Sequence, residues 1–445
     1  MYRMKRKGVA VAALAASALV LTGCTAGGDS ANEDGVTTIL AVVWPGPEGD
    51  AMEIVADEYN ADQGKEDKVE VQTVLLGRED TFNKEATEMA VQSSQFDVYW
   101  TASYILEQHA PHLEPLNDID TGIFFPTAVD AMSIDGNVMA LPLDVSMHYT
   151  FYRQDLMDEL LNNEAEWEKF GDISEQVVGE RLQPVSPQEW TWDDFSATAA
   201  YFTKTLNPDS PTEFGTAIAA KNTPFNVMFW NNVLWGNGGN WMENDEPALD
   251  SDAAMEAMEV YRTAFENGLV SPDSTQGDFN FLQSSMQSGS IALMHQWVSG
   301  FATLNDPEMS PATAGKIGVA PVPGQKAHVH FLAAAMNKYS EKKEAAMKWL
   351  EYLATEDAQT AYAQAGGIPS VSEVLLANAD QNPMFEYMAE DVDKYGYVEP
   401  RFENGTQYQA FVALGDALSG GWINSESAEA ALEKGQQALA ELAGN

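Results

Sequence analysis

The fold is decided first by residues 37–47, which read TTILAVVWPGP. The first seven form a β-branched, apolar run of strand length, and the Pro- and Gly-containing tail ends it before a helical pattern at 50–60. An alternating strand at 68–74, a helical pattern at 80–93 and a short apolar strand at 96–100 follow. This rhythm predicts a mostly parallel sheet with helices on both faces, in which ligands bind beyond the carboxyl ends of the strands.

The rest of the chain predicts a second, helix-rich unit. Residues 133–142 predict a hairpin, and 143–152 predict a long extended segment that suits a crossover between two units. Helices are expected at 193–203, 226–235, 251–267, 278–288, 342–355, 357–365, 408–419 and 427–442, and strands at 291–294, 317–321 and 331–336. A folded body of about 410 residues exceeds the size at which one core keeps growing, so two domains are expected.

The chain of 445 residues is strongly acidic, with 68 Asp and Glu against 23 Lys and Arg. Phosphate backbones are poor partners for such a surface, so nucleic acid is excluded. The acidic residues are spread over predicted helical faces, which is typical of a solubilising surface. The single cysteine, Cys24, excludes disulfide bonds and Cys-ligated metal sites.

The N-terminus has the features of an exported precursor. Its basic residues are Arg3, Lys5, Arg6 and Lys7. An apolar run at 9–21 follows and leads into LTGC at 21–24, whereas a membrane-spanning helix, the alternative, needs about 20 apolar residues. The segment resembles that of a bacterial lipoprotein. It predicts a signal peptide at 1–23, lipid on Cys24, a polar tether at 24–35, and a location on the extracytoplasmic face of the cell membrane.

Eight short segments form an ordered series along the body. They are FDVYW (96–100), HLEPLND (112–118), DGNVMALP (135–142), YTFYRQDL (149–156), EWTWDDF (189–195), GNGG (236–239), GSIALM (289–294) and GGIPS (366–370). In this order they resemble the family-1 extracellular solute-binding proteins of sugar ABC transporters. The resemblance implies a type II periplasmic-binding-protein fold. Its two α/β lobes, each a mostly parallel sheet flanked by helices, would be joined by a hinge, with the ligand between them. The lobes would comprise 36–144 plus 329–365, and 145–328 plus 366–445.

The sequence departs from the family pattern in three places. An acidic residue expected shortly after the third strand is missing from 100–103, and the basic residue expected after GGIP is replaced within 370–372. Residues 162–186 are additional, and one hypothesis is that they cap a rim of the cleft. These differences leave the identity of the sugar open.

Four tryptophans are candidate stacking rings, because aromatic rings cover the C–H faces of a pyranose. They are Trp44, Trp100, Trp230 and Trp297. Trp44 and Trp100 end predicted strands, and Trp297 stands where the resemblance implies a stacking residue. The alternative for each of them is packing in a core.

Five further residues are candidates for binding sugar hydroxyls, namely Asp144, His148, Asn226, Arg401 and Tyr408. Asp144 lies on the expected crossover, where a carboxylate could accept two hydroxyls. Asn226 is one turn from Trp230, although Phe225 and Phe229 indicate that the same helix also packs a core. Arg401 lies in a Pro-bounded loop that resembles a segment bordering the site in the family, and its alternative role is a surface salt bridge.

We expect a non-enzymatic, monomeric protein that binds a mono- or oligosaccharide and presents it to ABC permease subunits. The sequence contains no nucleophile elbow, phosphate-binding loop or HExxH motif, so no catalytic residue, cofactor or metal is expected. His109 with His112, and His328 with His330, lack an obvious third ligand. Two alternatives stay open: a lipid-anchored glycoside hydrolase, which also needs a sugar cleft with paired carboxylates, and a sugar-sensing surface receptor.

Overall fold

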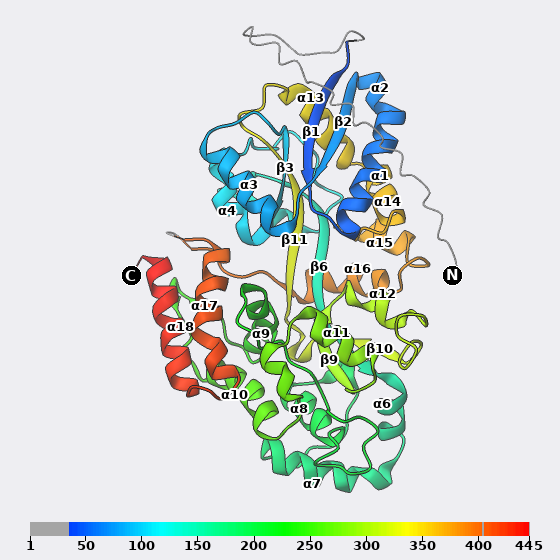
Figure 1. The fold of residues 1–445 in the computed structure, drawn as a ribbon, viewed down its shortest axis with the longest axis vertical. Coiled ribbons are helices and arrows are strands. Elements are labelled where there is room, and N and C mark those ends of the chain that lie inside the picture. The colour runs from blue at the N-terminus through cyan, green and yellow to red at the C-terminus, as the bar shows by residue number, and fades with distance from the viewer. Residues whose placement is uncertain (1–34, 403–404, 445) are drawn as a thin grey trace, which may run out of the picture.

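The computed structural model describes residues 35–402 and 405–444. The predicted signal peptide and the predicted lipidation site Cys24 lie outside these residues. Figure 1 shows two α/β lobes stacked along the long axis, with two long strands running from one lobe into the other. The two-lobed α/β fold class predicted from the sequence is therefore confirmed.

Lobe one begins with the predicted βαβ pattern. β1 (Thr37–Val43) pairs in parallel with β2 (Val69–Leu75) and with β3 (Val98–Ala102). Because β3 extends to Ala102, Trp100 lies inside the strand and does not end it. The helices of this lobe are α1 (Pro47–Ala61), α2 (Gln63–Asp67), α3 (Arg78–Ala90), α4 (Leu106–His109), α5 (Pro126–Ala131), α13 (Lys343–Leu353) and α14 (Glu356–Gln364). The expected hairpin forms as β4 (Ser133–Ile134) and β5 (Asn137–Val138).

Two long strands carry the sheet from lobe one into lobe two. β6 (Leu141–Arg153) pairs with β11 (Ala327–Met336) through its first half, and β11 pairs with β3. The second half of β6 pairs with β9 (Leu293–Trp297) and β10 (Ile317–Ala320). All of these pairings are antiparallel, and those of β6 with β9 and β10 correct the expectation of a mostly parallel sheet in lobe two. The reason is that one strand, β6, runs through both lobes and its neighbours return beside it.

Helices make up most of lobe two. They are α6 (Gln154–Leu161), α7 (Trp167–Val178), α8 (Trp192–Tyr201), α9 (Pro224–Gly236), α10 (Asp252–Glu266), α11 (Phe279–Gln287), α12 (Gly300–Asn305), α17 (Gln407–Trp422) and α18 (Ala428–Ala443), with the short hairpin β7 (Met242–Glu243) and β8 (Glu246–Pro247). Thr191 and Asp194 form a capping box that starts α8, as their spacing favours.

The additional residues 162–186 do not cap the cleft. They form α7, which packs against α8 at the end of lobe two farthest from lobe one (Figure 1). Lys169 pairs with Asp209, and the hydroxyl of Tyr201 donates to Glu166. These contacts extend the outer core of lobe two, so the cap hypothesis is wrong.

A third chain segment also runs between the lobes. α15 (Ser372–Ala377) and α16 (Met384–Tyr395), which the sequence did not predict, pack next to α14 and α5. β12 (Gly396–Tyr397) then joins the lower part of β11, and the chain continues across the middle of the molecule to α17 (Figure 1). We therefore propose that the return into lobe two lies after α16 and not at residue 366.

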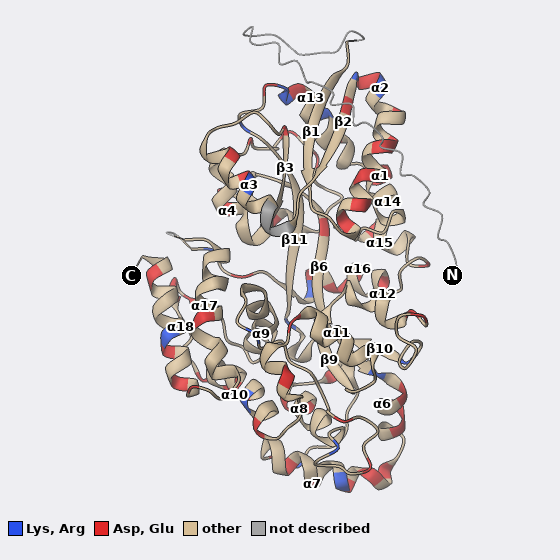
Figure 2. Cartoon of the chain, in the orientation of Figure 1, with Lys and Arg blue, Asp and Glu red and all other residues tan. Residues whose placement is uncertain are grey.

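Acidic residues are distributed over both lobes, with few basic residues between them (Figure 2). This distribution agrees with the expected solubilising surface. Among the described helices, none combines the length and apolar character needed to cross a membrane.

Candidate binding site between the lobes

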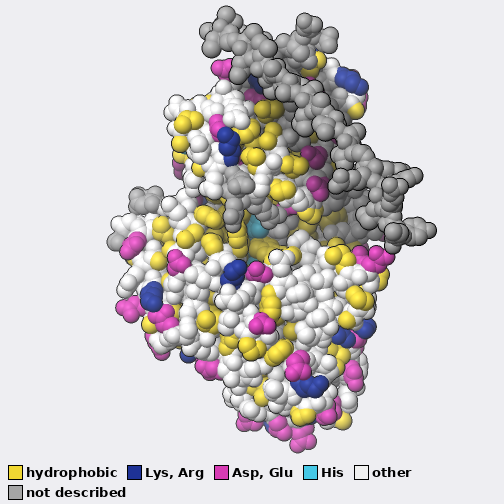
Figure 3. Space-filling model, in the orientation of Figure 1, with side chains coloured by type: hydrophobic (Ala, Val, Ile, Leu, Met, Phe, Trp, Pro, Cys, Tyr) yellow, Lys and Arg dark blue, Asp and Glu magenta, His cyan; other side chains and the backbone are white. Residues whose placement is uncertain are grey.

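A row of aromatic rings connects the two lobes. Trp44, which follows β1, meets Phe82 of α3 edge to face, with ring centroids 5.1 Å apart. Phe82 lies 6.4 Å from Tyr408 of α17, and Tyr408 stacks with Tyr104 at 6.3 Å. Figure 3 shows hydrophobic and histidine side chains gathered in the hollow between the lobes. Phe82 and Tyr104 of lobe one therefore contact Tyr408 of lobe two.

The row continues onto the crossover strands. Tyr104 lies 5.5 Å from His330 of β11, and His330 lies 4.8 Å from Trp297 at the end of β9. Trp297 in turn covers His148 of β6 at 3.7 Å. The structure thus brings together four of the predicted residues, Trp44, His148, Trp297 and Tyr408. Phe82, Tyr104 and His330 complete the row.

Strand pairing positions Trp297 and His148. The two residues are direct partners in the β6–β9 ladder, and Nδ2 of Asn232 lies 2.9 Å from Nδ1 of His148. Burial, with help from neighbouring histidines, holds the pKa of His148 well below its ordinary value, so the ring is neutral. Trp297 is partly exposed whereas His148 is fully buried, so Trp297 is the one that can touch a ligand and His148 supports it from behind.

The carboxylate of Asp144 forms hydrogen bonds with two other segments of the chain. Its Oδ2 accepts hydrogen bonds from the Tyr362 hydroxyl at 2.9 Å and from the Ile368 amide at 3.0 Å. It is 5% exposed, and it also forms a bridge with Pro369. Asp144 therefore ties the GGIPS segment and α14 to the crossover strand. Its contact with sugar hydroxyls stays a prediction.

Two predicted residues lie inside the core of lobe two. Trp230 is 0% exposed and packs against Trp422. The side chain of Asn226 donates to the carbonyl oxygens of Lys221 and Gly277, at 2.8 and 2.9 Å. Since α9 is apolar on nearly all sides, the alternative of core packing is the one that the structure supports for both residues.

Trp100 and Arg401 also have partners within the protein. Trp100 is 1% exposed, and its amide donates to the buried carboxyl of Glu85 at 2.9 Å. Arg401 donates to the carbonyl of Ala131 at 2.8 Å and lies 3.8 Å from Glu107. Arg401 thus joins the third crossing segment to lobe one, a role that the sequence did not indicate.

The sequence contained partial signals for the residues that it missed. Tyr104 comes two residues after β3 ends, which is the position where ligands meet a parallel sheet. The family pattern has an acidic residue near this position, so the pattern did not indicate an aromatic ring. His330 was considered only as a metal ligand. Among the described residues, no group of three His, Cys, Asp or Glu side chains is placed to hold a metal ion. Phe82 gave no signal, because its place depends on how α3 packs.

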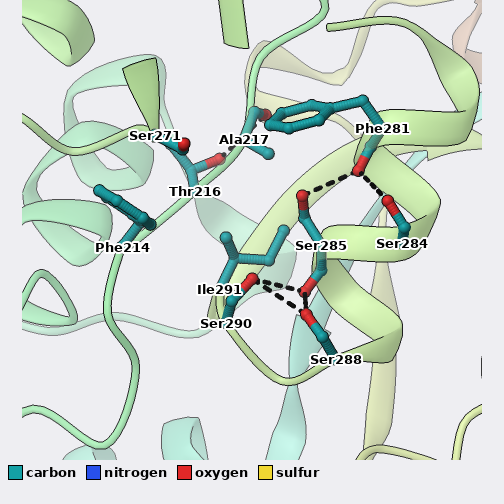
Figure 4. Close-up of a pocket in the computed structure, with 10 residues that line it drawn as sticks. All are labelled: Phe214, Thr216, Ala217, Ser271, Phe281, Ser284, Ser285, Ser288, Ser290 and Ile291. Carbon is teal, nitrogen blue, oxygen red and sulfur yellow. Dashed lines mark hydrogen bonds between the residues drawn. The ribbon is translucent and has the colours of Figure 1, made fainter. Parts of the chain in front are cut away.

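A cavity of about 200 Å³ lies elsewhere in lobe two and shares no residue with the row of rings (Figure 4). Serine hydroxyls line it beside Phe214 and Phe281. Those of Ser284 and Ser285 donate to the carbonyl of Phe281, and that of Ser290 donates to the carbonyl of Ser285. Because their protons serve the turns of α11, we assign the binding site to the row of rings and not to this cavity.

A comparison with protein families identifies a match that covers most of the chain. The sequence profile described as "bacterial extracellular solute-binding protein" matches residues 55–387. Putative binding proteins of Brucella abortus (strain 2308) and Brucella suis biovar 1 (strain 1330) are each 22% identical over 281 residues. These alignments cover 62% of this chain and 61% of the length of each relative.

Solved structures of binding proteins share the fold. The maltose-bound T. maritima protein MalE3 has a TM-score of 0.72 at 20% identity, covering 91% of this chain and 99% of that one. An ABC substrate-binding protein of Listeria monocytogenes in complex with cycloalternan has a TM-score of 0.71 at 20% identity, covering 92% and 99%. A solute-binding protein of Agrobacterium radiobacter K84 in complex with ribitol has a TM-score of 0.69 at 18% identity, covering 92% and 98%. At these identities the likeness establishes the fold.

Proposed function

This chain belongs to the bacterial extracellular solute-binding proteins, and on that premise we propose that it captures a neutral carbohydrate between its lobes and delivers it to the permease of an ABC transporter. In this proposal, lipid on Cys24 holds the protein on the extracytoplasmic face of the cell membrane. The protein performs no chemistry on its ligand, and the ATP-driven motor belongs to partner subunits.

The observation that carries the proposal is the row of rings between the lobes. It runs from Trp44 and Tyr104 in lobe one to Trp297 and Tyr408 in lobe two. Ring faces suit the C–H faces of a sugar, and rings make this contact between the lobes, beside a polar contact in which the Gln407 amide of α17 donates to Glu107 of α4. The relatives in complex with maltose, cycloalternan and ribitol support a sugar or polyol as the ligand class.

The same geometry supplies a mechanism for delivery. Trp44 is itself buried and supports Phe82, which is the partly exposed ring of lobe one. A ligand that touches Phe82 on one side and Trp297 on the other makes all its contacts only when the lobes are closed. It therefore shifts the population toward the closed form by its difference in affinity for the two forms. A permease that recognises the closed form can then distinguish loaded from empty protein.

Calorimetric titration with a sugar panel tests the proposal. Maltose, cycloalternan and ribitol are the first probes, because the similar solved structures are in complex with them. We expect saturable binding of at least one of them, with one site per chain and no new reducing ends after prolonged incubation. Release of reducing ends from an oligosaccharide would instead support the glycoside hydrolase, and binding of none of the probes would contradict the assigned ligand class.

Membrane attachment is tested at Cys24. In a bacterial host that acylates lipoproteins, the full-length precursor is expected to incorporate labelled palmitate and to sediment with membranes. The Cys24→Ser precursor should lose the label and leave the membrane fraction, because the lipid chains supply the anchoring free energy. A Thr25→Ser precursor is the matched control and should behave like the natural protein. Equal labelling of the Cys24→Ser precursor would refute the proposed anchor.

A further inference from the structure

Each of the three segments that run between the lobes carries a buried titratable side chain at the same place. β6 contributes His148, β11 contributes His328, and the segment 396–402 contributes Glu399. Figure 1 shows β6, β11 and the connection from α16 to α17 meeting at the middle of the molecule. A movement of one lobe against the other must change the distances among these three segments. The three side chains therefore lie at the hinge.

The three groups are close to one another and away from water. The rings of His148 and His328 are 5.7 Å apart, and Nδ1 of His328 lies 3.5 Å from Oε2 of Glu399. The side chains of His328 and Glu399 are both 0% exposed. Neither ring nitrogen of His328 has a hydrogen-bond partner in the part of the chain that the structure describes. Such poorly satisfied buried groups are costly, which calls for a functional explanation.

The charged and titratable groups around this cluster come from several elements. His295 of β9 faces His148, and His330 of β11 faces His328. Glu107 of α4 acts on Glu399 and lies near Arg401. The side chains that face the cluster from α9 and α17 are uncharged, namely Asn232, Trp235, Phe411 and Gln407. Among the described residues of these elements, the fixed positive charge nearest in sequence to Glu399 is Arg401, and it pairs with Glu107, so no cation stabilises an ionised Glu399.

We propose that this cluster is a proton-operated hinge. The closed form keeps His148, His328 and Glu399 dry and uncharged, whereas opening separates the three segments and admits water. Proton uptake by a histidine, or proton loss from Glu399, then favours the open form and weakens ligand binding. This inference deepens the proposed function and rests on it where ligand affinity is concerned, while the hinge itself is open to test without a ligand.

The direction of the pH dependence follows from the pKa of each group. Burial raises the pKa of Glu399 to about 8, so the closed form keeps a proton that the open form loses above about 4.5. This group makes closure less favourable as the pH rises from about 4.5 to about 8. Burial lowers the pKa of His148 and of His328, so these groups make closure less favourable as the pH falls below about 6.5.

The combination predicts a maximum. Above about pH 6.5 only Glu399 changes its protonation on closure, and the equilibrium constant for closure falls by up to tenfold per pH unit until about pH 8. Below about pH 6.5 closure releases two protons from the histidines and takes up one on Glu399. The net release of one proton makes the equilibrium constant for closure fall again, by up to tenfold per pH unit, as the pH falls. The closed form is therefore most populated near pH 6.5.

Small-angle X-ray scattering of the ligand-free protein between pH 5 and pH 9 tests the hinge. We expect the smallest radius of gyration near pH 6.5 and larger values on both sides. Glu399→Gln should remove the alkaline increase and steepen the acid one, and His328→Gln should flatten the acid one. His109→Gln is the matched control, because His109 is also fully buried with a lowered pKa but lies in lobe one.

Ligand affinity gives a second readout, with maltose or another probe that binds. Its dissociation constant should show the same minimum near pH 6.5 and the same changes in the two variants. A radius of gyration that does not vary with pH, or an alkaline increase that persists in Glu399→Gln, would overturn the hinge. If no sugar binds at any pH while the scattering profile has its predicted shape, the proposed ligand class fails and the hinge stands.

Discussion

Replacement of Trp230 by alanine is expected to lower the free energy of unfolding by about 3–5 kcal/mol without changing the sugar affinity of the folded protein. Trp230 is 0% exposed and packs against Trp422, which in turn lies 5.7 Å from Tyr261. Removing an indole from this cluster loses buried apolar area and leaves a cavity between α9, α10 and α17. Urea unfolding measures the change in stability, and calorimetry measures affinity per folded molecule.

Phe225→Ala is the matched control for this substitution. Phe225 lies on the same helix as Trp230 but is 44% exposed, so its removal should cost less than about 1 kcal/mol. If Trp230→Ala unfolds near the same urea concentration as the natural protein, the packing role is refuted. If its stability falls but its affinity also falls tenfold or more, Trp230 contacts the ligand after all.

Trp230 illustrates where prediction from the sequence reaches its limit. The sequence placed the indole on a helix, correctly, and one turn from Asn226. On α9, however, apolar residues occur on almost every side. The pattern therefore contains no amphipathic face that would distinguish residues of the core from residues that line the cleft. Strand ends are more informative, because the edge of a sheet fixes where the next residue lies. Of the tryptophans proposed near strand ends, Trp44 and Trp297 lie in the row of rings, whereas Trp100 is buried inside β3. Contact of Trp44 or Trp297 with a ligand stays a prediction.

The residues that the sequence missed depend on contacts between distant elements. Phe82 meets Tyr408 across 326 positions of sequence, and only the tertiary fold brings the two rings to 6.4 Å. The additional residues 162–186 were misplaced for the same reason. Their helical character could be read locally, but which end of lobe two they cover is set by the packing of α7 on α8. The direction of the strands beside β6 likewise depends on pairings that local patterns do not specify.

Replacement of Trp297 by alanine is expected to weaken sugar binding by about thirtyfold, or about 2 kcal/mol. Trp297 is the partly exposed ring of lobe two that bridges His330 and the buried His148. Its loss removes the apolar surface on which a sugar face would lie, and it opens water access to His148. The dissociation constant for the bound sugar, measured by calorimetry near pH 6.5, gives the magnitude.

Two further variants separate stacking from support. Trp297→Phe keeps a ring at the same position, so its affinity should fall by less than about tenfold. Asn232→Ala removes the hydrogen bonds to the His148 ring and to the His328 amide and keeps the Trp297 side chain, so it tests whether the support behind the ring matters. Unchanged affinity in Trp297→Ala, with the fold intact by circular dichroism, would move the binding site away from the row of rings. A large loss in Trp297→Phe as well would show that the indole's shape or its N–H, and not an aromatic face alone, selects the ligand.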